Sequence, residues 1–422
     1  MAPGEPVPRD LLARTLEEVE PRQRADGLRR LGAVGLVEES GGWLRLHRLL
    51  VRFVRREELD PAAQSAVERA LIACGRDAEQ GHLTGPRLAV AIPHLVEVAG
   101  AAGERGDDEM RMADLCNAVG LALAYGGDGR AARPWYERAL DIRERVQGPD
   151  HPDTAQGLSN LGHLVHEQGD PGHARRLHER ALSIRQRVRG PDHPDTAESL
   201  NNLGVVLGQQ GELAAARPLL ERALAIWEQV LGSDHPHTVV SLNNLGMLLL
   251  QDGQLAAARP LLERALATRE RVLGPDHPGT ALSLTNLARL LRDQGELAAA
   301  QSFIEPALAI RERALGPDHP DTAISLDGLA RLLHVRGELD AARPLFERAL
   351  AIRRRARGPD HPRTADSLDS LGTLLRDQGE LDAARPLLER AADIRERVLG
   401  PDHPDTVATR RALEELAGEE DG

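Results

Sequence analysis

The chain has 422 residues, a formal net charge of −13 and an aromatic content of 2%. All 53 of its basic residues other than histidine are arginines, which excludes a P-loop lysine, a Schiff-base lysine and a lysine general base. The acidic balance argues against general nucleic-acid binding. The abundance of alanine, leucine, arginine and glutamate indicates a helical protein whose helices pack leucine against small side chains.

The cysteines and the N-terminus indicate the cellular compartment. Cys74 and Cys116 stand apart without a C-x-x-C pair, which favours reduced, buried thiols. Residues 1–10 lack the basic–apolar–small pattern of a secretory signal, and no apolar run approaches membrane-spanning length. We therefore expect a soluble cytoplasmic protein that needs no cofactor.

Residues 1–60 carry the pattern of a small mixed module. Gly41 and Gly42 mark a turn between a strand at Leu36 and Val37 and a returning strand from Trp43 to Leu46, which predicts a β-hairpin. The apolar periodicity predicts helices on both sides of it, at 11–19, 23–31 and 47–58. This order of helix, helix, hairpin and helix predicts a partial winged-helix module over residues 1–60.

The run from Leu28 to Leu50 resembles the winged helix that follows the nucleotide-binding domain of NB-ARC-type STAND ATPases. In that family a Met-His-Asp motif opens the last helix, and its histidine faces the bound nucleotide. Here His47 stands between Leu46 and Arg48, and no G-x-x-x-x-G-K-[ST] motif occurs in the chain. The resemblance implies the C-terminal part of a larger nucleotide-dependent regulator, in which we expect His47 to be a packing residue at a helix start.

The same module has a second possible function, which is DNA binding. Arginines 45, 48, 52, 55 and 56 form a basic run, and winged helices often bind DNA. Residues 1–60 hold about as many acidic residues as arginines, so a DNA-binding regulator is the weaker alternative.

The sequence pattern of residues 61–106 predicts a helical connector that caps the repeats that follow it. One helix begins at Pro61 and ends near Cys74, and a second covers 87–102. Pro93 lies inside the second helix and should kink it.

One tripeptide recurs at intervals of 42 residues without any insertion. Asp-His-Pro begins at Asp150, Asp192, Asp234, Asp276, Asp318, Asp360 and Asp402. A fixed period of this size indicates a solenoid of stacked helical units, so the predicted fold is all-α.

Helix-breaking glycines divide each unit into two helices. In one unit the first helix should cover 195–209, Gly211 should break it, and the second helix should cover 212–231 before Gly232. This gives seven helix pairs over 107–404. A lone helix at 407–416 should cover the last open face, followed by a solvated acidic end within 405–422.

The apolar and small positions of these units match a known consensus. Large, large, small and large residues on the first helix are followed by alanine, large and alanine on the second, as at Leu200, Leu203, Gly204, Leu207, Ala216, Leu220 and Ala223. The array therefore resembles tetratricopeptide repeats. The 42-residue period, the L-x-N-L-G phrase and Asp-His-Pro are similar to kinesin light chain repeats. The resemblance implies a right-handed superhelix whose concave surface, lined by the first helices, binds extended peptides.

Two series of small residues should allow helices to approach closely. One series is predicted where the two helices of a unit meet, at Gly120, Gly162, Gly204, Gly246, Ala288, Ala330 and Gly372. The other is predicted between successive units, at Ala132, Ala174, Ala216, Ala258, Ala300, Ala342 and Ala384.

The repeated histidines do not predict a metal site. A metal needs converging ligands, whereas a fixed repeat places these loops side by side along one edge. We expect each loop to be a turn whose Asp and Thr side chains cap the following helix. No Ser-His-Asp or Cys-His arrangement is evident, so the chain is not expected to be an enzyme.

Polar side chains on the predicted first helices form the candidate binding site. Its amides are Asn160, Asn202, Asn244 and Asn286, and its histidines and arginines are His163, His166, Arg289, Arg292, Arg331, His334 and Arg376. In the family, such asparagines bond a peptide backbone or a carboxylate, and an arginine fork suits carboxylates. One hypothesis is that the groove binds an extended acidic segment of a partner. The other is that the arginines pair with the groove's own acids, Asp293, Asp327, Asp369 and Asp377.

The sequence thus predicts a non-enzymatic scaffold for protein or peptide partners. The alternative is a sensor arm of a STAND switch whose NTPase domain is supplied elsewhere.

Overall fold

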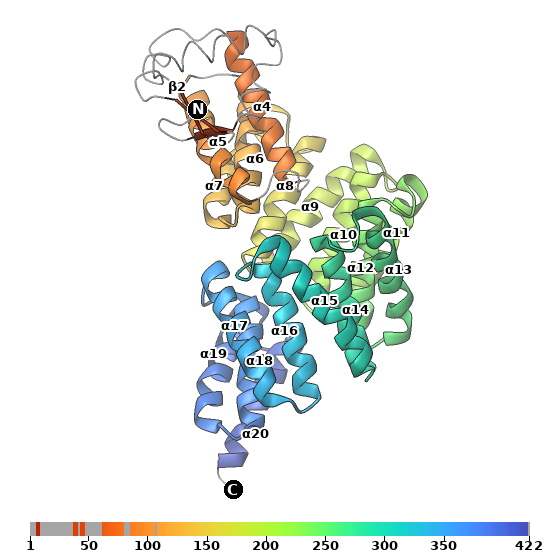
Figure 1. Ribbon diagram of the computed structural model, residues 1–422. Coiled ribbons are helices and arrows are strands. Elements are labelled where there is room, and N and C mark those ends of the chain that lie inside the picture. The colour runs from red at the N-terminus through yellow and green to blue at the C-terminus, as the bar shows by residue number, and fades with distance from the viewer. Residues whose placement is uncertain are drawn as a thin grey trace. The chain divides into compact units, whose positions relative to one another are not determined.

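The computed structural model describes residues 6–8, 37–40, 43–46, 61–79, 85–105 and 108–420, which form seventeen helices and one small sheet (Figure 1). The predicted helices at 11–19, 23–31 and 47–58 lie outside the described residues. The chain divides into two units, Met1–Leu164 and Val165–Gly422, each of which is described by itself.

The sheet contains three short strands, β1 (Pro6–Pro8), β2 (Val37–Ser40) and β3 (Trp43–Leu46). Strand β3 lies in the middle and pairs antiparallel with both neighbours, in the order β1-β3-β2. The predicted hairpin is therefore confirmed, whereas the pairing of β1 was not predicted. The assignment of residues 1–60 to a winged helix stays a prediction.

Two helices precede the repeats. They are α4 (Pro61–Glu79), which continues past its predicted end at Cys74, and α5 (Gly85–Arg105), which contains Pro93. Both pack against α6 (Glu109–Tyr125), the first helix of the first repeat. The connector therefore covers the face of the array that no earlier repeat covers.

Seven helix pairs follow, as the 42-residue period predicts. After α6 come α7 (Gly129–Val146), α8 (Pro152–Glu167), α9 (Pro171–Arg189), α10 (Pro194–Gln209), α11 (Leu213–Leu231), α12 (Pro236–Gln251), α13 (Leu255–Leu273), α14 (Pro278–Asp293), α15 (Leu297–Leu315), α16 (Pro320–Val335), α17 (Leu339–Arg357), α18 (Pro362–Asp377) and α19 (Leu381–Leu399). From α8 onward every first helix begins at the proline of Asp-His-Pro, where its missing N–H costs no hydrogen bond.

Close contact within a repeat requires the small residues. A Cβ added to Gly204 would lie 2.8 Å from Leu220, and one added to Gly246 would lie 2.7 Å from Leu262. The backbone of some of the predicted alanines also lies at this contact. The carbonyl oxygen of Ala216, for example, lies 3.3 Å from the position of that Gly204 Cβ.

The histidine of each Asp-His-Pro loop caps the following first helix. In the loop at His193, Nδ1 accepts a hydrogen bond from the backbone N–H of Asp195 at 3.1 Å. Thr196 instead donates its hydroxyl to the carbonyl of Gly190, which ends the preceding helix. The prediction that Asp and Thr would cap the helix was therefore wrong. The imidazole takes that role because its Nδ1 reaches the exposed N–H two residues on.

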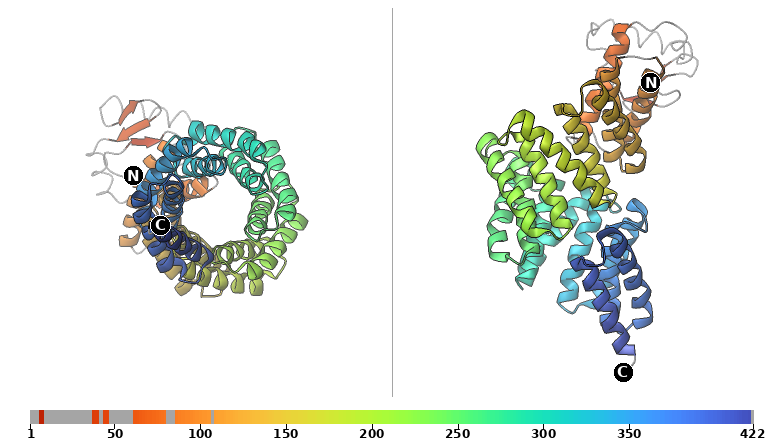
Figure 2. Two further views of the ribbon diagram at one scale, coloured as in Figure 1. Left: turned by 90° about the horizontal axis from the view of Figure 1, so that it is seen from below. Right: turned by 180° about the vertical axis from the view of Figure 1, so that it is seen from behind.

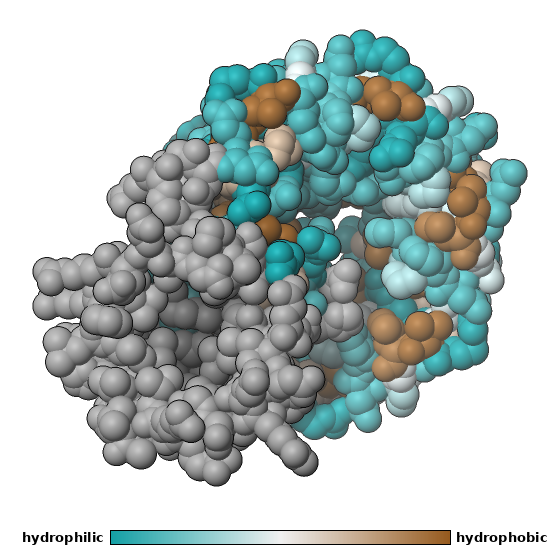
Figure 3. All heavy atoms as spheres, turned by 90° about the horizontal axis from the view of Figure 1, so that it is seen from above, coloured by the Kyte–Doolittle hydropathy of each residue, from teal (hydrophilic) through white to brown (hydrophobic). Residues whose placement is uncertain are grey.

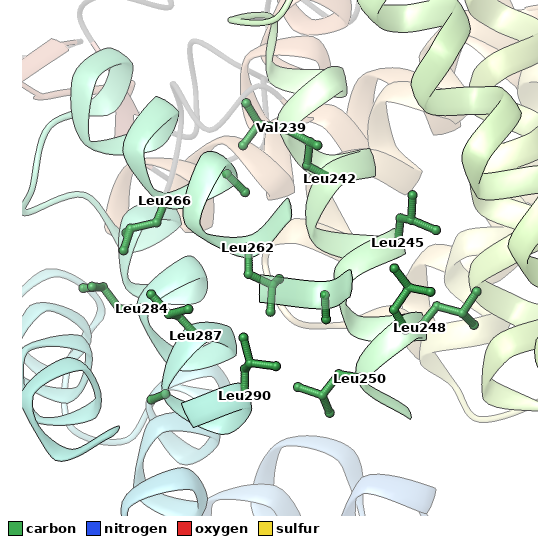
Figure 4. Close-up of a cluster of buried hydrophobic side chains, with 14 of the residues drawn as sticks. Val239, Leu242, Leu245, Leu248, Leu250, Leu262, Leu266, Leu284, Leu287 and Leu290 are labelled. Carbon is green, nitrogen blue, oxygen red and sulfur yellow. The ribbon is translucent and has the colours of Figure 1, made fainter. Parts of the chain in front are cut away.

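Leucines form a core that continues from repeat to repeat. Leu242, Leu245 and Leu248 of α12 pack with Leu262 of α13, and the cluster extends through Leu287 of α14 (Figure 4). Because each unit buries its apolar face on its neighbours, the array needs no single central core.

The second unit curves far enough to contact itself. His361, which caps α18, also bonds through Nε2 to the carbonyl oxygen of Glu167 at the end of α8, 2.5 Å away. One repeat later, Nε2 of His403 lies 2.9 Å from the carbonyl oxygen of Gln209 at the end of α10. Each contact joins residues 194 positions apart, and Figure 2 shows the helices of this unit curving round on themselves. We call these two contacts the turn-to-turn clasp.

Helix α20 (Pro404–Glu420) closes the C-terminal end against α18 and α19. Its Leu416 is fully buried, which confirms the predicted capping helix. The helix continues to Glu420, so most of the acidic end expected to be a tail is helical.

Both cysteines are free and buried, as predicted. Burial raises the pKa of the Cys116 thiol to about 11. Among the described helices, none combines the length and the apolar character that crossing a membrane requires.

Candidate functional site

The first helices of successive repeats line the concave surface of the second unit. Helices α10, α12, α14, α16 and α18 each contact the next in this series. Polar side chains on their shared face therefore form a continuous strip, and this strip holds most of the predicted site residues.

The predicted asparagines hydrogen-bond along the array. Asn244 and Asn286 donate their side-chain N–H groups to Asn201 and Asn243 of the preceding first helices, at 3.0 and 3.1 Å. In the first unit, Asn160 donates to Asn117 in the same way, at 2.9 Å. These three amides hold neighbouring repeats together, and the oxygen of Asn160 also accepts a hydrogen bond from Gln156 at 2.9 Å.

Asn202 differs from the other three asparagines. It is 6% exposed, and its Nδ2 is buried with no hydrogen-bond acceptor within the described part of the chain. The residue 43 positions earlier is Ser159, where the other three asparagines have an asparagine at that spacing, so the series of amide pairs is interrupted here.

The three predicted histidines lie in different settings. His163 is exposed on the first unit. His166 contacts the side chain of Gln209 through Nε2. His334 contacts the carboxylate of Asp377 at 2.7 Å, and its ring meets Phe346 edge-on.

Most of the predicted arginines pair with carboxylates of the concave surface. Arg292 pairs with Asp293 at 2.6 Å and Arg331 with Asp327 at 2.8 Å. Arg376 pairs at 3.0 Å with both Asp377 and Glu415. The hypothesis of self-pairing holds for these three arginines. Asp369, by contrast, pairs with Arg395 of a second helix, at 3.1 Å.

Arg289 is the exception among the predicted arginines. Within the described residues no carboxylate lies within 4.0 Å of its guanidinium, although the side chain is exposed. Desolvation by burial and the charges of Arg292 and Arg331 lower the pKa of Arg289, against the opposing charges of Asp293 and Asp327. Arg289 is therefore the groove cation whose charge the protein leaves least neutralised.

A series of buried arginines on the second helices was missed from the sequence. All of them except Arg143 donate to the next repeat, as Arg311 does to the Ser325 hydroxyl at 2.7 Å and Arg353 to the Ser367 hydroxyl at 2.6 Å. The detectable signal is an arginine every 42 residues with a hydroxyl residue 14 positions later. The series comprises Arg143, Arg185, Arg269, Arg311, Arg353 and Arg395, with Trp227 in the remaining place.

The described residues on one face of the molecule are mostly hydrophilic (Figure 3). Figure 3 shows hydrophilic residues over most of the coloured surface, with the hydrophobic residues in separate patches. Glu–Arg pairs four residues apart cover the second helices as predicted, for example Arg217 with Glu221 at 2.7 Å.

The tetratricopeptide repeat family model matches the chain in seven overlapping segments, 112–186, 173–229, 201–270, 241–305, 286–354, 330–397 and 368–420. These matches cover more than half of the chain, which therefore belongs to the tetratricopeptide repeat family. Repeats of this family form scaffolds for protein–protein interaction. No curated protein sequence matches the chain.

Three solved structures of different kinds are among those that match the chain. A kinesin light chain of Podosopora anserina with nearly identical repeats is 29% identical over 49% of this chain and 97% of its own, with a TM-score of 0.38. The Rap conjugation gene regulator of plasmid pLS20, solved with the Phr* peptide, is 16% identical over 70% of this chain and 77% of its own, with a TM-score of 0.57.

The third is a STAND protein with a tetratricopeptide repeat sensor from Pyrococcus horikoshii. It is 16% identical over 99% of this chain and 58% of its own, with a TM-score of 0.54. The likenesses to the Rap regulator and the STAND protein show a shared fold.

Proposed function

We propose that this chain is a non-enzymatic interaction scaffold whose concave surface binds an extended, acidic segment of a partner protein. The observation that carries the proposal is Arg289, an exposed guanidinium without a carboxylate partner in the described structure. A guanidinium fork binds carboxylates in a planar, bidentate geometry, and the neighbouring asparagine oxygens suit peptide N–H groups. The Rap regulator of similar fold was solved with a peptide, which supports a peptide as the ligand class.

A direct test compares two fluorescent peptides, hexaglutamate and hexaglutamine, with both ends capped. We expect hexaglutamate to bind more tightly, and its affinity to fall as salt rises because counterions screen the contact. Charge reversal at both Arg289 and Arg292 should abolish this preference.

Reversal of Arg271 and Arg313 is the matched control. These two arginines pair with Asp234 and Asp276 along the loop edge rather than on the concave surface. Equal binding of the two peptides by the unaltered protein, or equal loss in the control, would disprove the proposal.

A second candidate function is the sensor arm of a STAND switch. It is favoured by the fold shared with the Pyrococcus horikoshii protein over 99% of this chain. An immunoblot of the native cell with an antibody to the repeats tests it. A band much larger than 45.8 kDa supports the sensor arm, whereas a band at that mass argues for a scaffold that acts alone.

A further inference from the structure

The turn-to-turn clasp joins two opposite edges of the second unit. One edge holds the short connections between the two helices of each repeat, and we call it the glycine edge after Gly169, Gly211, Gly253, Gly295, Gly337 and Gly379. The other edge holds the Asp-His-Pro loops between repeats, and we call it the histidine edge after His193, His235, His277, His319, His361 and His403. The clasp places the last two of these histidines on the first two connections of the glycine edge.

Both contacts of the clasp are built from the same two parts. The histidine Nε2 reaches the carbonyl oxygen at the end of a first helix, and the proline after the histidine packs on the glycine of the connection. A Cβ added to Gly211 would lie 3.4 Å from Pro404, so the missing side chain gives the proline room to approach. Docking also covers the imidazole, since the side chain of His403 is only 3% exposed.

The other repeats of this unit present the same parts uncovered. Among the described residues, nothing would lie within 4 Å of a Cβ added to Gly253, Gly295, Gly337 or Gly379. On the histidine edge, the side chains of His193 and His319 are 36% and 40% exposed. Nδ1 caps a helix in each free loop, whereas Nε2 makes no hydrogen bond within the described part of the chain at His193, His235, His277 and His319.

The free part of the histidine edge also carries exposed apolar side chains. Val188, Val230 and Val272 are 46%, 52% and 49% exposed, and each lies five residues before a histidine of this edge. Their equivalents beside the two clasped loops are Ala356 and the half-buried Val398. Docking on the free loops would therefore remove from water an apolar surface that the clasped loops do not expose.

The spacing of the two edges allows several such contacts at once between two molecules. Both edges follow the same 42-residue repeat, so a second copy shifted by whole repeats can align several histidines with several glycines. One contact alone is weak between separate molecules, but contacts that form together reinforce one another. A contact between two different surfaces also leaves one free edge on each molecule, so it can continue from copy to copy.

We propose that a second copy of this chain docks the free part of its histidine edge on the free part of the glycine edge, so that molecules associate head to tail. The occupant is a second copy because the clasp already shows these two surfaces of this chain in contact. This association uses the two edges and leaves the concave surface outside the contact.

Sedimentation velocity of the full chain at rising concentration tests the proposal. The average mass should rise beyond that of a dimer. Replacing the four free histidines by asparagine keeps an oxygen that can cap the helix but removes Nε2, and should weaken association by about tenfold or more. The matched control makes the same change at the clasp, His361→Asn with His403→Asn. It should associate at least as strongly as the unaltered protein, because it frees two more positions on each edge.

A mixing experiment tests whether the contact joins two different surfaces. A glycine-edge variant carries asparagine at the four free glycines, since asparagine tolerates positive φ and its side chain blocks the approach of the proline. This variant and the histidine-edge variant should each stay monomeric alone. Mixed together they should form dimers and nothing longer, because each retains the edge that the other has lost. Dimer formation also shows that both variants are folded.

Three outcomes would overturn the proposal. The first is an unaltered protein that stays monomeric up to about 1 mM. The second is a histidine-edge variant that associates as strongly as the unaltered protein. The third is a clasp variant that loses association to the same extent, since exchange of the clasp between molecules would then explain the oligomers.

Discussion

At the scale of single residues, the buried arginines show that this repeated contact requires both an arginine and a hydroxyl residue. Arg143 faces Gly157 where the other arginines face a hydroxyl residue, and its Nη1 and Nε are buried without a partner in the described structure. Trp227 replaces the arginine one repeat before Arg269, and the Ser241 hydroxyl that an arginine would reach is likewise unpaired there. The arginine and the hydroxyl therefore form one unit, and losing either member leaves the other unsatisfied.

This pairing makes a prediction for Ser325, which is fully buried and accepts from Arg311. Ser325→Ala should lower the free energy of unfolding by about 1–3 kcal/mol, because a buried charged donor loses its acceptor. Ser302→Ala is the control, since that exposed hydroxyl bonds only to the Ala299 carbonyl in its own helix and should change stability by less than about 0.5 kcal/mol. Urea unfolding measures both, and equal effects would contradict the assignment.

The sequence predicted which residues reach the concave surface but not how they pair. The positions of Arg292 and Arg331 follow from helix periodicity, which is a property of the backbone. Their partners depend on side-chain rotamers, since Asp293 is the next residue along the helix and Asp327 is one turn earlier. The capping by His193 was missed for the same reason, because an imidazole reaches the N–H only in one orientation.

At the scale of helices, the sequence predicted the helix boundaries more closely than it predicted the side-chain partners. The observed α10 and α11 each begin one residue from the predicted helix, because proline and glycine fix the boundaries. Glycine in the turn after α10 has φ +80°, a conformation that other residues rarely adopt. The lengths of α4 and α20 were underestimated, since each helix continues through a glycine, Gly75 or Gly418, that stands just after its predicted end.

Close packing of these helices predicts a steric effect at Ala258, which is fully buried in α13. Ala258→Leu should cost about 1–3 kcal/mol of unfolding free energy because the larger side chain overpacks the buried leucine cluster to which Ala258 belongs. Ala257→Leu, on the exposed side of the same helix, adds the same atoms and should cost much less. Unfolding in urea that leaves the two variants alike would disprove the packing role of Ala258.

At the scale of the whole molecule, the period predicted a solenoid but not that its second unit meets itself. The curvature accumulates from small rotations between repeats, which no single residue specifies. The clasp of His361 and His403 therefore appears only in three dimensions, although its loops carry the same Asp-His-Pro phrase as the other repeats.

The clasp makes a prediction for two glycines in equivalent turns. A Cβ at Gly169 would lie 2.5 Å from Pro362, the residue after His361 of the clasp, whereas one at Gly253 would meet nothing within 4 Å. Both have positive φ, of +84° and +73°, so alanine strains the backbone at each. Gly169→Ala should cost about 1–3 kcal/mol more than Gly253→Ala, from the added steric clash. Equal losses in chemical denaturation would show that the clasp does not form in solution.

The clasp also bears on how such an array can change in length over evolution. Glu167 and Gln209 offer the same backbone carbonyl at the end of a first helix, and His361 and His403 approach them from the same loop phrase. If one 42-residue unit were duplicated or deleted between them, a different histidine would arrive at the same carbonyl. The clasp uses only features that every repeat possesses, so it can form with a different number of repeats. Selection can therefore add or remove whole repeats of the groove without breaking the contact between its turns.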